Sequence, residues 1–269
     1  MPITDSNFPL IVADLFKDLA SVQATILRRE VPLLAMLGAL PTARGRVLEI
    51  GAFQGASTIV LSRTSRYAGD DYIWTVDPFT SPSETDPEIA ESSCYPTFLN
   101  NLRATGEEPY VRVHRGLSQE LARRWNEPIR ALWIDGDHTY AGAKQDFDLF
   151  SPHLSDGAMI AFHDVLASQP GPARVFACDV LLSPHFGPCG VSGSIGWAQF
   201  VADPEQSTRH IAKKLRLYSA ICQHAGAQAL GVRLPRLAKI RYNLFRNRNR
   251  NAPSFSTFRK AVLPPRRHE

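Results

Sequence analysis

The 269-residue sequence lacks several features that mark membrane, secreted and cysteine-metal proteins. No apolar run approaches the roughly 18 residues that a membrane-spanning helix needs. The start, MPITDSNFPL, contains Asp5 and no basic region, so it does not predict a signal peptide. The four cysteines have no CxxC spacing; they are Cys94, Cys178, Cys189 and Cys222. Their scatter argues against a zinc site or a disulfide framework, and predicts a cytoplasmic protein with reduced thiols.

Acidic residues are nearly absent from the C-terminal end. From residue 230 onward the sequence has eleven Lys or Arg and one acid, Glu269, so this part carries 11 − 1 = +10. Because the whole chain carries +4, the remainder carries 4 − 10 = −6. The basic character therefore belongs to the tail, and it gives no clear indication of nucleic-acid binding by the whole chain. The Arg- and Asn-rich composition predicts a partly disordered tail over residues 230–269, able to make a weak contact with an anionic surface.

Short apolar runs alternate with helical patterns through the middle of the chain. The predicted strands are GRVLEI, YIWTVD, YVRVHRG, ALWIDGD and GAMIAFHDV, and GVSGSIGWAQFVA contains one or two more. The predicted helices between them are STIVLSRTSRYA, capped by Ser57 or Thr58, then YPTFLNNLRATG, LSQELARRW and GAKQDFDLFSPHL. Strands separated by helices predict an α/β fold, with a mostly parallel sheet covered by helices on both faces.

Four regions follow from these patterns. Residues 1–40 are predicted to form one or two amphipathic helices, broken near Pro32, that act as a lid or cap. Residues 41–204 hold the main α/β domain, and residues 205–229 form a helical extension before the basic tail at 230–269. Within the main domain, residues 80–94 are polar and proline-containing, which predicts a mobile loop.

The first chemical motif is EIGAFQGAS, where a strand runs into a glycine turn and a helix N-terminus. Such a turn lets backbone N–H groups approach a ligand closely. Gly51 and Gly55 supply the flexible positions, but Phe53 interrupts the G-x-G-x-x-G dinucleotide pattern. The motif fits either a ligand-binding turn, with Ala52 and Ser57 close to the ligand, or a tight turn without a ligand.

The second motif is VDPF, at the end of the next strand. Asp77 follows Gly51 by 77 − 51 = 26 residues. A carboxylate at this place in a nucleotide-binding fold can accept hydrogen bonds from two ribose hydroxyls. A lone aspartate at a strand end is more often a turn residue, but the preceding glycine turn favours the ribose-binding role.

The third motif joins the ends of two later strands, LWIDGDH and AFHDV. In an open parallel sheet, ligands bind beyond the carboxyl ends of the strands, so Asp135 and the pair His163–Asp164 should converge. Two carboxylates and an imidazole suit Mg²⁺ or Mn²⁺. His138 is the candidate general base, with Asp137 orienting it. Strand-end capping, or a histidine bonded to turn backbone, remains the simpler alternative.

Taken together, several segments resemble one family: VLEIGAFQGAST, TVDPF, TFLNNLRATG, LWIDGDHTYAGAKQDFDLFSPHLSDGAMIAFHDV and GSIGWA. They are similar to the bacterial class I S-adenosylmethionine-dependent methyltransferases with IDGDH-Y and HDV motifs. These are relatives of the macrocin-type and cephalosporin-hydroxylase-like sugar O-methyltransferases and, more distantly, of catechol O-methyltransferase. The resemblance covers roughly residues 40–200. It implies a Rossmann-like sheet with a seventh, antiparallel strand within GSIGWAQFV, and S-adenosylmethionine as the methyl donor.

The resemblance also assigns roles to individual positions. It places Glu49 at the amino group of S-adenosylmethionine, and it places Gly116, Leu117 and Ser118 against the adenine. Asp135 would contact the cofactor and bind a metal ion. The position after the fifth strand departs from the catechol-type pattern of an acid followed by Asn, since this chain has His163 and Asp164 there. Either Asp135, His163 and Asp164 bind an ion together, or His163 is a catalytic base without one.

The expected function is methylation of a hydroxyl on a small acceptor, either a sugar or a glycosylated natural product. One alternative is a nucleic-acid methyltransferase anchored by the basic tail. It is disfavoured because no NPPY-like base-flipping tetrapeptide is present. The other alternative is a non-catalytic module that docks through the tail. It is disfavoured because acids remain at both strand ends. The sequence leaves homo-oligomerisation open.

Overall fold

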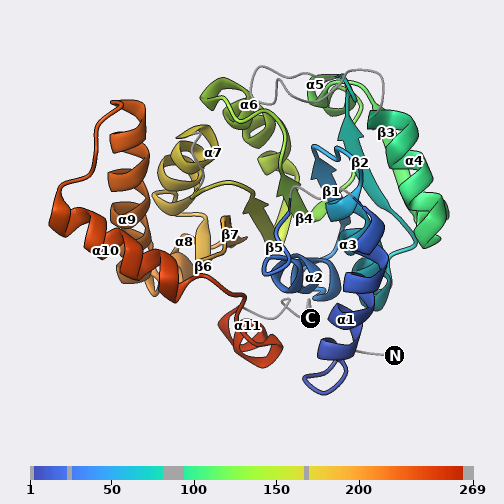
Figure 1. The fold of residues 1–269 in the computed structure, drawn as a ribbon, viewed down its shortest axis with the longest axis horizontal. Coiled ribbons are helices and arrows are strands. Elements are labelled where there is room, and N and C mark those ends of the chain that lie inside the picture. Colours follow the sequence, from blue (N-terminus) through green and yellow to red (C-terminus); the bar gives the residue numbers. More distant parts are fainter. Residues whose placement is uncertain (1–2, 23–25, 81–93, 167–169, 263–269) are drawn as a thin grey trace.

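The computed structural model describes residues 3–22, 26–80, 94–166 and 170–262. They contain a seven-stranded sheet in the order β3-β2-β1-β4-β5-β7-β6 (Figure 1). The strands are β1 Arg46–Ile50, β2 Ile73–Asp77, β3 Val111–Arg115, β4 Ile129–Ile134, β5 Leu154–Phe162, β6 Phe186–Ser192 and β7 Ile195–Phe200. Strands β1 to β5 are parallel, and β7 runs antiparallel to both β5 and β6. The predicted Rossmann-like sheet is confirmed, and its antiparallel strand lies within GSIGWAQFV.

Helices cover both faces of this sheet. They are α1 Phe8–Asp18, α2 Val31–Ala39, α3 Ala56–Ser65, α4 Cys94–Thr105, α5 Ser118–Ala122, α6 Tyr140–Phe150, α7 Pro170–Val175, α8 Pro204–Thr208, α9 Ile211–Ala229, α10 Arg236–Arg248 and α11 Phe255–Ala261. A π-helix, Phe176–Leu181, follows α7 directly. The helical segment between β5 and β6 therefore packs on the same face of the sheet as α6. None of the helices in the described residues is long and apolar enough to cross a membrane.

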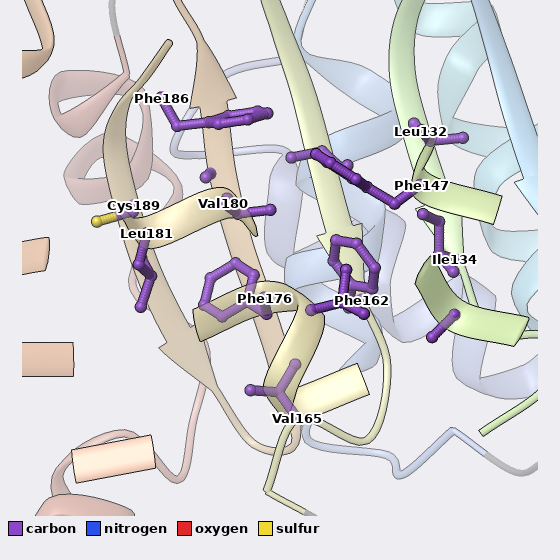
Figure 2. Packing of buried hydrophobic residues seen from close by; sticks show 14 of the residues in the cluster. Leu132, Ile134, Phe147, Phe162, Val165, Phe176, Val180, Leu181, Phe186 and Cys189 are labelled. Carbon is purple, nitrogen blue, oxygen red and sulfur yellow. The ribbon is translucent and has the colours of Figure 1, made fainter. Parts of the chain in front are cut away.

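Alternating side chains of β4 divide the core into two layers. Leu132 and Ile134 pack in the cluster that includes α6 and α7, whereas Trp133 packs in the cluster that includes α2 and α3. Figure 2 shows Leu132 and Ile134 beside Phe147 of α6 and Phe162 of β5. Because successive strand residues point to opposite faces, β4, whose six residues are all buried, packs against helices on both sides of the sheet.

Two predictions about helix starts are wrong in detail. Pro32 is the second residue of α2 and does not break it, because a first-turn residue needs no N–H donor. All residues of α2 except this proline are buried, so α2 is a helix of the core. An amphipathic helix that acts as a lid was expected here. Helix α3 begins one residue before Ser57, and its cap position is Gly55 with φ of +92°. Ser57 and Thr58 therefore lie inside the helix and do not cap it.

The C-terminal end contains helices where disorder was predicted. Helices α10 and α11 lie within residues 230–262, so the prediction of disorder is wrong for these two segments; residues 263–269 lie outside the described part. Phe255 of α11 stacks on Phe8 of α1 at 5.0 Å between ring centroids, and Phe258 contacts Trp197 at 4.8 Å. Apolar residues spaced along a basic segment thus anchor it to the core. Most of the predicted mobile loop at 80–94 also falls outside the described residues, which omit 81–93.

Candidate active site

A pocket of about 380 Å³ lies beyond the carboxyl ends of β1 to β5. In an open parallel sheet, this edge, where the loops after the strands meet, is the usual place for a ligand. The residues after these strands supply most of its lining. Of the predicted site residues, those that line it are Gly51, Ala52, Phe53, Ser57, Asp77, Gly116, Leu117, Ser118, Asp135, His138, His163 and Asp164. The two predicted residues that are not part of its lining are Glu49 and Gly55.

The glycine turn after β1 is held against the ends of β2 and β4. Gly51 has φ of +86°, and a Cβ at this position would overlap the carbonyl group of Asp135. The backbone N–H groups of Ala52 and Phe53 donate to Asp77 Oδ2 at 2.7 Å and 2.9 Å. Glycine is therefore required for the close approach of two strand ends, and Asp77 fixes the backbone of the turn.

Asp77 is positioned for two tasks. Its Oδ1 accepts a third backbone hydrogen bond, from Phe79 N at 2.6 Å. Burial raises the pKa of Asp77, although the three backbone donors oppose this rise. Two carboxylate oxygens offer about four acceptor positions, so three backbone bonds leave room for a ligand hydroxyl. The residue is thus a structural clamp on the turn, with spare capacity for the predicted ribose contact.

Glu49 lies beneath the turn and away from the pocket lining. Its side chain is fully buried, and Oε2 accepts a hydrogen bond from Thr58 Oγ1 at 2.5 Å. Burial raises the pKa of Glu49 to about 7, although hydrogen bonds from Ser57, Thr58 and Thr75 oppose the rise. The side chain of Glu49 therefore bridges β1 and α3. The contact with the cofactor's amino group that was predicted for it would have to form outside the pocket lining seen here.

The carboxylate of Asp135 is paired with a buried histidine. His163 Nδ1 lies 3.0 Å from Asp135 Oδ1, and its Nε2 lies 3.4 Å from Glu30 Oε2. Burial would lower the pKa of His163, but Asp135 and Glu30 outweigh it and raise the pKa well above the usual value. A cationic imidazole with both nitrogens directed at carboxylates is unsuited to binding a metal or accepting a proton. The predicted ligand and base roles of His163 therefore do not fit its contacts.

Glu30 was absent from the predicted site, yet it completes this buried group. It precedes α2, is fully buried, and its Oε1 accepts hydrogen bonds from Ser194 N at 2.7 Å and Ser194 Oγ at 2.9 Å. Burial would raise the pKa of Glu30, but its bonds to His163, Ser194 and Leu27 lower it overall. Because residue 30 is 133 positions from His163, no local pattern could have linked them. Glu30 joins the N-terminal segment to the β6–β7 turn and to β5.

His138 faces the two carboxylates that the sequence predicted. Its Nε2 lies 3.6 Å from Asp135 Oδ1 and 3.4 Å from Asp164 Oδ2. Asp135, His138 and Asp164 each offer a ligand atom, and these atoms all lie within 4.8 Å of one another. Burial raises the pKa of Asp164, whereas the charges of His163 and His138 oppose that rise. This group can act as a carboxylate-flanked base or as a set of ligands for a divalent cation.

Asp137 does not orient His138 as predicted. Its Oδ1 accepts a hydrogen bond from Thr139 N at 2.8 Å, and its Oδ2 accepts one from Thr139 Oγ1 at 2.9 Å. The same Thr139 oxygen accepts from Gly142 N at 3.0 Å and caps α6. Asp137 is thus the turn residue that starts α6, a common role for aspartate before a helix.

Residues 48–165 match a family model described as a methyltransferase domain. This chain carries a methyltransferase domain. Among solved structures it is similar to the O-methyltransferase NovP, with 13% identity, 74% of this chain and 100% of that chain covered, and a TM-score of 0.58. It is also similar to the O-methyltransferase TomG from Streptomyces achromogenes, solved with SAM, with 18% identity, 75% and 92% coverage, and a TM-score of 0.51. At these identities the likeness shows a shared fold.

The methyltransferase domain contains a buried acid that was not among the predicted site residues. Asp146 of α6 lines the pocket and its Oδ1 accepts a hydrogen bond from Ser118 Oγ at 2.5 Å. Burial raises the pKa of Asp146 to about 6, and the charge of Asp137 adds to the rise. Its place among Ala143, Phe147 and Phe150 on the buried face of α6 was a readable signal.

Backbone strain is concentrated at the pocket of this methyltransferase domain. In the described residues, the three non-glycine residues with positive φ are Phe53, Phe79 and Asp164, at 46°, 51° and 55°. All three line the pocket. Left-handed conformations are unfavourable for such side chains, and they persist where the surrounding structure fixes them. The strained residues therefore lie in the turns after β1, β2 and β5, at the edge of the sheet where the pocket opens.

Proposed function

We propose that this chain transfers a methyl group from S-adenosylmethionine to a hydroxyl of a small acceptor, a sugar or a glycosylated natural product. The observation that carries the proposal is the meeting of three groups in one pocket: the glycine turn, the Asp77 carboxylate, and His138 with its two carboxylates. The shared fold with O-methyltransferases, one of them solved with SAM bound, supports the same assignment.

The residues of the pocket fit the cofactor. Bound S-adenosylmethionine supplies an electrophilic methyl group. The turn residues Gly51, Ala52 and Phe53 line the pocket, and Asp77 has acceptor capacity for a ribose hydroxyl. Ser118 and Asp146 add polar groups suited to hydrogen-bonding an adenine base. His138 Nε2 would take the proton that the acceptor hydroxyl loses on methylation. Enclosure by the pocket excludes water and aligns the acceptor.

Binding of S-adenosylmethionine tests this proposal directly. Isothermal titration calorimetry with the whole chain is expected to show binding, and Asp77→Asn is expected to weaken it about 10- to 100-fold, because a hydrogen bond to a charged group is lost. Asp71→Asn is the matched control, because Asp71 is exposed just before β2. An unmodified chain that binds no S-adenosylmethionine contradicts the proposal.

A second candidate role for the same group is a divalent-cation site. Asp135, His138 and Asp164 would hold the ion, which would lower the pKa of an acceptor hydroxyl. A single Nε2 atom cannot bind an ion and accept a proton at the same time. We favour the base role, because Asp135 Oδ1 already faces the cationic ring of His163, which compensates part of its charge.

Chelation separates these two roles. The base role predicts that turnover is unchanged when EDTA is added to the assay. A loss of about 100-fold or more, reversed by Mg²⁺ or Mn²⁺ but not by Na⁺, would assign Asp135, His138 and Asp164 to an ion instead. A matched assay with excess Mg²⁺–EDTA controls for effects of the chelator itself.

A further inference from the structure

The C-terminal helices form a basic segment with no counter-charge of its own. Residues 206–262 contain thirteen Lys or Arg and no Asp or Glu. None of these basic side chains forms an ion pair with another residue in the described part of the chain. Figure 1 shows α10 at the outer edge of the molecule, on the side opposite α4. The segment therefore presents a field that attracts anions at a surface distant from the central strands.

Helix α10 has a packed face and an apolar exposed face. Tyr242 is buried and stacks on His224 of α9, with ring centroids 4.0 Å apart. On the other side, the exposed fractions of Leu237, Ile240 and Leu244 are 73%, 47% and 55%. Residues at spacings of three and four lie on one line of a helix, so these three side chains form a continuous stripe. The stripe points away from the protein core.

The turn before α10 carries further exposed apolar residues. Leu230 and Val232 between α9 and α10 are also exposed. Together with the stripe, they make five of the thirteen exposed large apolar residues in the described chain, gathered within fifteen positions. Such clustering is unusual for a surface that faces only water, where exposed apolar residues are generally scattered. It therefore favours the stripe of Leu237, Ile240 and Leu244 as a docking face, with Leu230 and Val232 in the turn that precedes it.

Arginines flank the stripe on both sides. At about 100° per residue, Arg241 and Arg248 lie along one side of the stripe, and Arg236 lies along the other. An apolar centre with basic edges matches a helix that lies in a lipid interface, with its apolar side chains at the acyl boundary and its guanidinium groups at lipid phosphates. Nucleic acid would complement the arginines but leave the leucines without a partner.

We propose that the outer face of α10 binds the surface of an anionic lipid bilayer. The side chains of the apolar stripe insert at the acyl boundary, and the unpaired arginines are attracted to the anionic headgroups. The side chains involved lie outside the pocket lining, so this inference does not depend on the proposed methyl transfer. It gives the C-terminal helices the task of holding the methyltransferase domain at a lipid surface.

Vesicle sedimentation tests the proposal with the full chain. We expect binding to vesicles of phosphatidylglycerol and phosphatidylcholine, and little binding to phosphatidylcholine alone. Replacing both Leu237 and Leu244 by serine should weaken binding by about tenfold or more, because two buried leucine side chains are lost. Neutralising Arg241 and Arg248 as Arg241→Gln and Arg248→Gln should weaken it by about fivefold for each charge.

A matched leucine and two other measurements make the outcome decisive. Leu10→Ser on α1 removes a leucine that is 67% exposed outside the C-terminal segment, and it should leave vesicle binding unchanged. Circular dichroism checks that each variant is folded. Absence of vesicle binding, or binding that the Leu237 and Leu244 changes do not alter, overturns the proposal. Dimerisation in analytical ultracentrifugation that these changes abolish would assign the face to a second copy of the chain and overturn it too.

Discussion

Replacing His138 with glutamine is expected to lower kcat by about 10²- to 10⁴-fold while S-adenosylmethionine still binds. Nε2 of His138 lies between Asp135 and Asp164 in the pocket, where it can accept the proton of the acceptor hydroxyl. Glutamine keeps similar polarity and size but cannot accept that proton. Initial-rate measurements with saturating cofactor, together with calorimetry on the same variant, separate the loss of chemistry from a loss of binding.

The pH dependence of the rate gives this prediction a second readout. A base that must be neutral to accept a proton makes kcat fall as the pH is lowered through the pKa of that base. The variant should lose this acidic limb, while His153→Gln should keep it, because His153 precedes β5 and lies at the end opposite the pocket. A variant with kcat within threefold of the unmodified chain would remove His138 from proton transfer.

The part of the site that follows strand ends could be predicted from the sequence. The strands β1, β2 and β4 are short and mainly apolar, and Gly51, Asp77 and Asp135 stand at or directly after their carboxyl ends. Parallel strands bring these ends to one edge, so Gly51, Asp77 and Asp135 had to converge once the sheet was identified. The same logic placed Asp164 after β5. The prediction worked because position along the strand fixes position in the pocket.

The residues that were missed or misassigned depend on contacts distant in sequence. Glu30 reaches His163 across 133 positions, and α11 folds back so that Phe255 meets Phe8. Composition alone suggested disorder for this tail because it cannot show which few apolar residues find a partner. Asp146 was different, since the helical spacing of Ala143, Phe147 and Phe150 already placed it on the buried face. His163 was misjudged because its second carboxylate partner was unknown.

Replacing Glu30 with alanine is expected to lower the free energy of unfolding by about 3–5 kcal/mol. The change leaves the buried cation of His163 with one carboxylate fewer, and it removes the acceptor for Ser194 N and Leu27 N. Buried groups that lose their partners still carry the full penalty of desolvation, and the methyl group of alanine cannot accept their hydrogen bonds. Urea unfolding monitored by fluorescence at constant pH measures the loss.

An exposed glutamate and a histidine titration show whether this loss arises from the buried pair. Glu108→Ala breaks an exposed pair with Arg103 and should cost less than about 1 kcal/mol. In Glu30→Gln, which keeps the shape of the side chain, nuclear magnetic resonance should show the pKa of His163 below that in the unmodified chain, because one of the carboxylates that raises it is gone. An unchanged His163 titration, together with a loss as small as that of Glu108→Ala, would contradict the role of Glu30 as the residue that holds His163 cationic beside Asp135.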